Sequence, residues 1–130
     1  MQFDVEQLAA ALKIACPEAR FALLHGSAKD GQIGPDSDID VALFIEGTAS
    51  LELYRRAQEA VHAVVAEAEA DIGILNHAEP VYRFEALKGR LLFCRDQEAY
   101  LSFFTRTCRE YEEQIADYQR QWTYRLSAAG

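Results

Sequence analysis

The segment between residues 26 and 40 constrains the fold of this chain more than any other. It reads Gly-Ser-Ala-Lys-Asp-Gly-Gln-Ile-Gly-Pro-Asp-Ser-Asp-Ile-Asp, a turn of small residues followed by two carboxylates, Asp38 and Asp40, at the head of an apolar run. In a β-strand, residues i and i+2 point to the same face, about 6 to 7 Å apart. Both carboxylates can therefore reach one hard cation or a close pair, and without a cation they repel each other. The spacing predicts a metal site at the start of a strand.

The turn before this strand predicts a phosphate-binding element. Glycine at position 26 lets the backbone approach a ligand closely, and the free N–H groups and hydroxyl of a helical turn opened by Ser27 would face a phosphate. Lys29 is close enough in sequence to neutralise that phosphate. His25 precedes the turn, and two interpretations stay open for it: contact with a nucleotide, or a strand-end histidine satisfied by the backbone.

Gly26-Ser27, followed ten residues later by Asp38-Ile39-Asp40, resembles the signature of the nucleotidyltransferase superfamily with the DNA polymerase β-like fold. The Pro-Asp-Ser before the pair is similar to the form found in short prokaryotic members, the minimal nucleotidyltransferases or MNT proteins. The resemblance implies a third acidic residue on a later strand, and Asp71 is the match. One residue departs from the family pattern, because Asp30 stands before Gly31 where many members carry a basic residue. The possibility therefore stays open that this chain keeps the fold but does not catalyse the reaction.

The chemistry that the resemblance implies is nucleotidyl transfer: an acceptor hydroxyl attacks the α-phosphate of ATP, and pyrophosphate leaves. Two Mg²⁺ ions would offset the charge on the attacking and leaving oxygens. Asp38 and Asp40 would hold both ions, while Asp71 would bind one and accept the proton of the acceptor. Ser27 and the backbone of Gly26 would steady the outer phosphates.

Length and charge narrow the remaining possibilities. A chain of 130 residues, 50% of them hydrophobic, can build one compact core, so residues 1–130 are predicted to form a single domain. The net charge of −8 argues against direct binding to nucleic acid. No stretch resembles a signal sequence or a membrane span, and three scattered cysteines indicate neither disulfides nor zinc. A reducing, cytoplasmic location without membrane contact is expected.

Hydrophobic periodicity predicts alternating helices and strands. Helices are expected at 5–15, 51–68 and 80–87 and from the cap at Asp96 onward, and strands at 21–24, 39–45, 71–75 and 90–94. This order predicts an α/β (α+β) sandwich, a small mixed β-sheet with helices on one face, in keeping with the polymerase β-like fold. The acids of the second and third strands would converge on the open face, and Gly73 beside Asp71 would leave room there for a substrate.

The last predicted helix, 96–128, carries a row of mostly aromatic residues spaced alternately by four and three: Phe104, Cys108, Tyr111, Ile115, Tyr118 and Trp122. The first half of the row, within 100–108, is expected to pack on its own domain. The second half extends beyond what a small sheet can cover, and tyrosine and tryptophan are enriched at binding hot spots. Tyr111, Tyr118 and Trp122 are therefore predicted to contact a partner protein or a second copy.

MNT proteins of this size resemble the antitoxins of two-component modules whose toxin is an α-helical HEPN ribonuclease. The resemblance implies that the chain binds such a toxin and transfers AMP from ATP to one of its tyrosines. The acidic charge suits a partner with a basic, RNA-binding face. Two alternatives stay open: a non-catalytic antitoxin that neutralises by binding, and a small-molecule nucleotidyltransferase, for which 130 residues leave little room for further substrate-binding segments.

Overall fold

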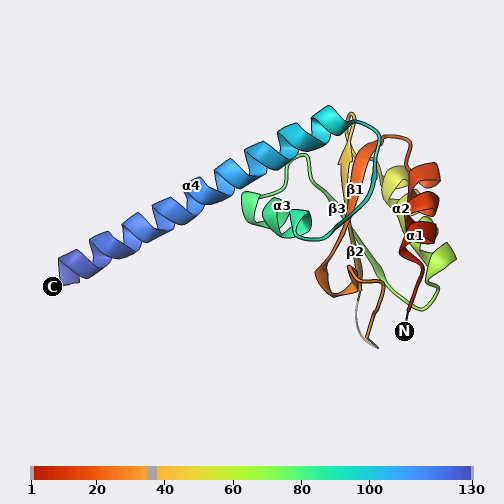
Figure 1. Ribbon diagram of the computed structural model, residues 1–130, viewed down its shortest axis with the longest axis horizontal. Helices are drawn as coiled ribbons and strands as arrows, with labels where there is room; N and C mark the ends of the chain where they lie inside the picture. Colours follow the sequence, from red (N-terminus) through yellow and green to blue (C-terminus); the bar gives the residue numbers. More distant parts are fainter. Residues whose placement is uncertain (1, 35–37, 130) are drawn as a thin grey trace.

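A computed structural model describes residues 2–34 and 38–129 (Figure 1). Its described residues form one mixed sheet in the strand order β3-β2-β1-β4. The strands β2 and β3 run parallel, and the other neighbours are antiparallel. Residues 35–37, which include the Pro-Asp-Ser stretch used above, lie outside the described residues. In chain order the elements are α1 (Val5–Ala15), β1 (Ala19–His25), the 3-10 turn η1 (Gly26–Ala28), β2 (Ile39–Ile45), α2 (Leu51–Val64), β3 (Ala70–Ile74), α3 (Pro80–Leu87), β4 (Arg90–Cys94) and α4 (Gln97–Ala129).

Side-chain caps mark the beginnings of α1, α2 and α4. The Asp4 carboxylate accepts a hydrogen bond from the backbone N–H of Glu6 at 3.0 Å, and the Ser50 hydroxyl accepts one from the N–H of Leu53 at 3.1 Å. Asp96 caps α4 in the same way. The expected helix 51–68 was too long, because α2 ends at Val64 and Val65 has a non-helical backbone. Val65 and Ala68 are still buried in the core, but they lie in an irregular segment after the helix.

The main core lies between the sheet and the pair α1 and α2, on one face of the sheet (Figure 1). Ile39, Val41 and Leu43 point into it from β2, as the predicted alternation requires. A second, smaller core lies on the opposite face, where α3 and the first turns of α4 pack on Phe21, Leu23 and Ala42. The face expected to carry the acids is therefore also partly covered by helices, and the carboxylates occupy one end of it.

The long helix α4 starts against the sheet and then extends away from the rest of the chain (Figure 1). Its first turns bury Phe103 and Thr107, whereas Phe104 is 44% exposed. The first half of the predicted row on this helix was therefore wrong. The buried residues Phe103 and Thr107 each lie one position before the predicted residues Phe104 and Cys108. Tyr111 lies against the domain, stacking on Phe84 of α3 with ring centroids 3.9 Å apart.

Beyond Tyr111 the apolar side chains of α4 are exposed, namely Ile115, Tyr118, Trp122, Tyr124 and Leu126. Tyr118 and Trp122 contact each other edge to face, with centroids 6.1 Å apart. No helix in the described part of the chain, α4 included, has an apolar stretch that would cross a bilayer.

An ion pair joins α3 to α4 beneath the stacked rings. The guanidinium of Arg83, whose side chain is 7% exposed, donates to the carboxylate of Glu110, and Glu110 also accepts from Arg106 at 2.9 Å. Within the described residues, the Nε of Arg83 and the hydroxyl of Thr107 are buried without a hydrogen-bond partner. Arg83 therefore depends on Glu110 for compensation of its buried charge.

Candidate active site

The turn that links β1 to β2 packs directly on a carboxylate. Gly26 has a positive φ of 71°, and a Cβ atom at this position would lie 2.3 Å from Oδ2 of Asp40. Two independent demands therefore select glycine: a left-handed backbone and a close approach to the Asp40 side chain. Ser27 and Lys29 follow in and just after the 3-10 turn, and both are exposed. Asp30 is exposed as well, so the acidic departure from the family pattern faces solvent.

The three carboxylates predicted from the sequence lie at one end of β2 and β3. Asp40 and Asp71 are register partners on these parallel strands, and Asp38 immediately precedes β2. Burial raises the pKa of the Asp40 carboxyl, and the charges of Asp71 and Asp38 raise it further, while His25 opposes them. The three acids are therefore close enough to influence one another electrostatically.

The donor set of this cluster fits a hard cation. Carboxylate oxygens are the ligands that Mg²⁺ prefers, and a cation between these side chains would offset the two effects that raise the Asp40 pKa, namely burial and then repulsion by Asp71 and Asp38. In the described residues, however, no three acidic, histidine or cysteine side chains converge closely enough to form a complete metal cluster. Asp38 and Asp71 are exposed, so their carboxylates are accessible to an ion from solvent.

Tyr82 completes the site from α3, and sequence reasoning missed it. Its hydroxyl is 3.3 Å from Nε2 of His25, the cross-strand partner of Asp40. A Cβ atom on Gly73 would lie only 2.0 Å from the same hydroxyl. The expected room for a substrate beside Gly73 is therefore absent, because the tyrosine fills it. The sequence carries no signal for this contact, since it depends on how α3 crosses the sheet.

Burial and neighbouring charge act in opposite directions on His25. Burial lowers the pKa of its imidazole, and Asp40, Asp71 and Glu85 partly counter that effect. Burial also raises the pKa of the Tyr82 phenol, with Asp71 and Asp40 adding to the rise. In the described residues the ring of His25 contacts another side chain, Tyr82, and not the backbone partner considered from the sequence.

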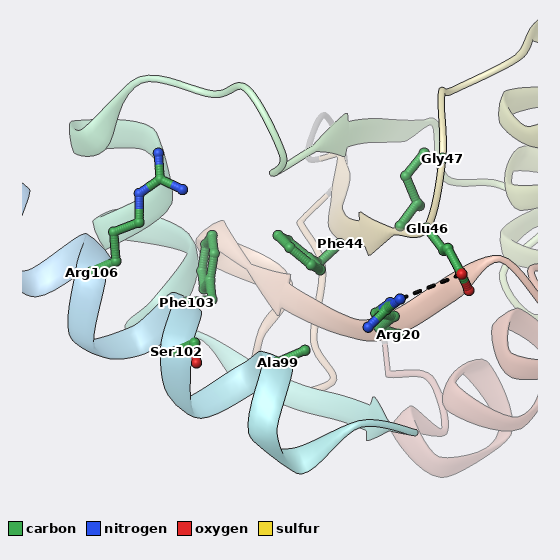
Figure 2. Close-up of a pocket in the computed structure, with 9 residues that line it drawn as sticks. Arg20, Phe44, Glu46, Gly47, Ala99, Ser102, Phe103 and Arg106 are labelled. Atoms are coloured by element: carbon green, nitrogen blue, oxygen red, sulfur yellow. Dashed lines mark ion pairs between the residues drawn. The ribbon is translucent and has the colours of Figure 1, made fainter.

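An apolar hollow of about 440 Å³ lies elsewhere, between the C-terminal end of β2 and α4 (Figure 2). The rings of Phe44 and Phe103 form part of its wall, and Arg20 at its edge pairs with Glu46 at 3.5 Å. Asp38 and Asp40 lie at the other end of β2. This hollow is therefore separate from the carboxylate site.

The comparisons with known proteins agree with this geometry. A family model described as polymerase beta, nucleotidyltransferase matches residues 6–98. The chain belongs to this nucleotidyltransferase family. The match extends from α1 to the start of α4 and includes Gly26, Asp38, Asp40 and Asp71. A search of curated protein sequences finds no match.

Solved structures share the fold over nearly the whole length of this nucleotidyltransferase family member. A toxin–antitoxin MntA–HpeT mutant, in which two aspartates two positions apart are replaced by glutamate, aligns with a TM-score of 0.75 and 18% identity, covering 95% of this chain and 98% of that one. A toxin–antitoxin complex with AMP-PNP aligns with a TM-score of 0.73 and 18% identity, with the same coverage.

A third structure contains the tri-AMPylated HEPN toxin of Shewanella oneidensis in complex with its MNT antitoxin. It aligns with a TM-score of 0.66 and 20% identity, covering 93% of this chain and 98% of that one. These likenesses confirm the predicted polymerase β-like fold with its long C-terminal helix. They also confirm, at the level of fold, the predicted resemblance to MNT antitoxins.

Proposed function

We propose that this nucleotidyltransferase transfers AMP from ATP to a tyrosine hydroxyl of a partner HEPN ribonuclease and so acts as its antitoxin. The observation that carries the proposal is the pairing of Asp40 with Asp71 on neighbouring strands, directly against the Gly26 turn. An acidic pair beside a phosphate-binding turn is the arrangement that nucleotidyl transfer needs. The structural relatives support the acceptor class, since one contains an AMPylated toxin and another contains AMP-PNP.

We assign each residue of the site a role on the basis of its position. Mg²⁺, in one or two ions held by Asp38, Asp40 and Asp71, would supply positive charge to the phosphates. The N–H groups of Gly26 and Ser27 at the start of the turn would bind the outer phosphates, with Lys29 neutralising them. Asp71 is the exposed member of the Asp40–Asp71 pair, so it would accept the proton of an incoming hydroxyl.

The exposed half of α4 provides the partner-binding surface in this proposal. Tyr118 and Trp122 are 58% and 46% exposed, although large aromatic side chains are usually buried. Tyr111 contributes less of its surface, because one face of its ring stacks on Phe84. The net charge of −8 favours a basic partner over nucleic acid. The chain 1–130 would act as one domain in the cytoplasm, where ATP and a ribonuclease target are both present.

One alternative retains specific support. Asp30 lies next to Lys29 in the phosphate-binding loop, where its negative charge would oppose a phosphate. This observation favours an antitoxin that neutralises by binding alone. A small-molecule nucleotidyltransferase has less support, because Tyr82 fills the space beside Gly73 where a small acceptor would fit.

One experiment separates these functions. The purified chain is incubated with Mg²⁺, ATP labelled on the α-phosphate, and a co-expressed HEPN partner, and label on the partner is mapped by tandem mass spectrometry. Label on a partner tyrosine that requires Asp38 and Asp40 supports the proposal. Complex formation and inhibition of the ribonuclease without label would establish the binding-only antitoxin instead.

A further inference from the structure

The hydroxyl of Tyr82 occupies the part of the acid face that an acceptor would otherwise enter. It lies against the backbone of Gly73, two residues along β3 from Asp71, where even a methyl group on the glycine would have no space. The phenol is half-buried, and the negative charges of Asp71 and Asp40 both act on it. A ring fixed at this position borders the carboxylates on one side.

Two contacts hold the ring in place. The hydroxyl is 3.3 Å from Nε2 of His25, and the two rings meet edge to face with centroids 5.4 Å apart. His25 is itself fixed at the end of β1, opposite Asp40 in the antiparallel ladder. The backbone at Gly73 limits movement on the other side. Tyr82 is thus clamped between β1 and β3 and does not resemble a freely moving surface tyrosine.

We infer that Tyr82, held by His25 and Gly73, is the specificity-determining wall of the acceptor side of this site. The inference rests on the proposed nucleotidyl transfer. By filling the space beside Gly73, the ring leaves no room on that side of Asp71 for a water molecule or a small alcohol. An acceptor hydroxyl must then be delivered from the open, Asp38 side on the side chain of a bound partner.

The wall limits a specific side reaction. When water takes the place of the acceptor, its oxygen bonds to the α-phosphorus, the bond to the β-phosphate oxygen breaks, and its protons pass to solvent. The products are AMP and pyrophosphate. Excluding water from reactive intermediates is a general function of closed active sites. Opening the wall should therefore increase ATP hydrolysis while it decreases transfer to the partner.

The test compares the unaltered chain with Tyr82→Ala, Tyr82→Phe and Tyr100→Ala. Tyr100 is the matched control, because it packs edge-on against Phe21 in the same second core without bordering the carboxylates. Two rates are measured: AMP release from ATP without partner, and AMP transfer to the HEPN partner. We expect Tyr82→Ala to raise AMP release at least about 5-fold and to lower kcat for transfer about 10-fold, with the KM for ATP within 2-fold.

The other variants distinguish the loss of the Tyr82 barrier from a general loss of stability. Tyr82→Phe keeps the ring but removes the hydroxyl that fills the space beside Gly73, so its two rates should lie between those of the unaltered chain and of Tyr82→Ala. Tyr100→Ala should leave both rates unchanged even if its melting temperature falls. Should Tyr82→Ala fail to fold, Tyr82→Leu removes the ring and its hydroxyl while keeping an apolar side chain in the second core, and it should give the same rise in AMP release. Unchanged rates in a folded Tyr82→Ala or Tyr82→Leu variant would overturn this inference alone. Absence of any transfer by the unaltered chain would overturn the proposed function together with it.

Discussion

Gly26 lies so close to Asp40 that any side chain at position 26 would displace the carboxylate. The Gly26→Ala variant should therefore lose nucleotidyl transfer. It should also lose about 1 to 2 kcal/mol of stability, because an alanine must adopt a positive φ there. Gly47 is the matched control, since it also has a positive φ of 84° but has no atom within 4 Å of a Cβ position. Gly47→Ala should lower the free energy of unfolding by a similar amount, measured by thermal unfolding, and should keep the full rate of nucleotidyl transfer. Equal activity in both variants would contradict the role assigned to this contact.

Replacing Asp38 and Asp40 together with Asn should abolish transfer without unfolding the chain. The folded pKa of Asp40 is raised, so its contribution to stability is present when it is protonated and is lost as pH rises through that pKa. At neutral pH the charged cluster therefore destabilises the metal-free protein. The double variant should melt at the same or a higher temperature than the unaltered chain at pH 7 in EDTA. Its advantage should shrink as pH falls through the raised folded pKa of Asp40 toward the usual Asp value. A large loss of stability at pH 7 would refute this.

Asp71→Asn should lower the transfer rate by roughly 100-fold or more, in line with the loss of a positioned base. ATP affinity should fall less, since Asp40 and the Gly26 turn remain. Single-turnover transfer and equilibrium binding of AMP-PNP measure the two quantities separately. Equal losses of rate and binding would instead make Asp71 a metal ligand without a separate role toward the acceptor.

The Arg83–Glu110 pair predicts an acid-sensitive junction between α3 and α4. Hydrogen bonds from Arg106, and then from Arg83, lower the pKa of the Glu110 carboxyl. A lowered carboxyl pKa contributes stability above its unfolded value, and this stability is lost as pH falls through the folded pKa. Glu110→Gln should reduce the melting temperature at pH 7 more than Arg106→Gln does, because it also leaves the buried Arg83 unpaired. The difference between the two variants should vanish in acid. Identical pH profiles at all pH values would show that the junction does not depend on this carboxylate.

Tyr118 and Trp122 should separate partner binding from chemistry. Replacing both with Ala should weaken association with the partner by about 2 to 4 kcal/mol if they are buried anchors there. AMP-PNP binding and the melting temperature of the isolated chain should stay unchanged, because both side chains are exposed. Tyr111→Ala provides the contrast, since it removes the stack on Phe84 and should lower the melting temperature. Unfolding of the double variant would show that these residues belong to the chain's own core.

Much of the fold follows from local sequence signals. The caps at Asp4, Ser50 and Asp96 fix where three helices begin, and the alternation along Ile39–Ile45 assigns one face of β2 to the core. These signals act within a few residues, so one sequence suffices to interpret them. The same alternation places Asp40 and Asp71 on the face of their strands opposite the main core, whereas their meeting at one end of the sheet comes from the parallel pairing of β2 with β3.

Contacts between distant elements could not be predicted in this way. The placement of Tyr82 beside Gly73 depends on the crossing of α3 over the sheet, and the Gly26–Asp40 contact depends on the path of the turn. The row on α4 was misplaced by one residue in its first half because Phe103 and Phe104 are equally apolar. Only the angle at which α4 meets the sheet decides that Phe103 is buried and Phe104 is not.

The projection of α4 also has a consequence for which acceptor can react. Trp122 lies about 16 Å farther along the helix than Tyr111, at 1.5 Å per residue, and Tyr111 still touches the domain through Phe84. A partner bound to the distal part of the helix is thus held at a fixed separation from the carboxylates. Its reactive hydroxyl must lie at a matching separation from its own binding surface. The helix would then work as a molecular ruler, selecting a tyrosine by its distance rather than by the residues around it.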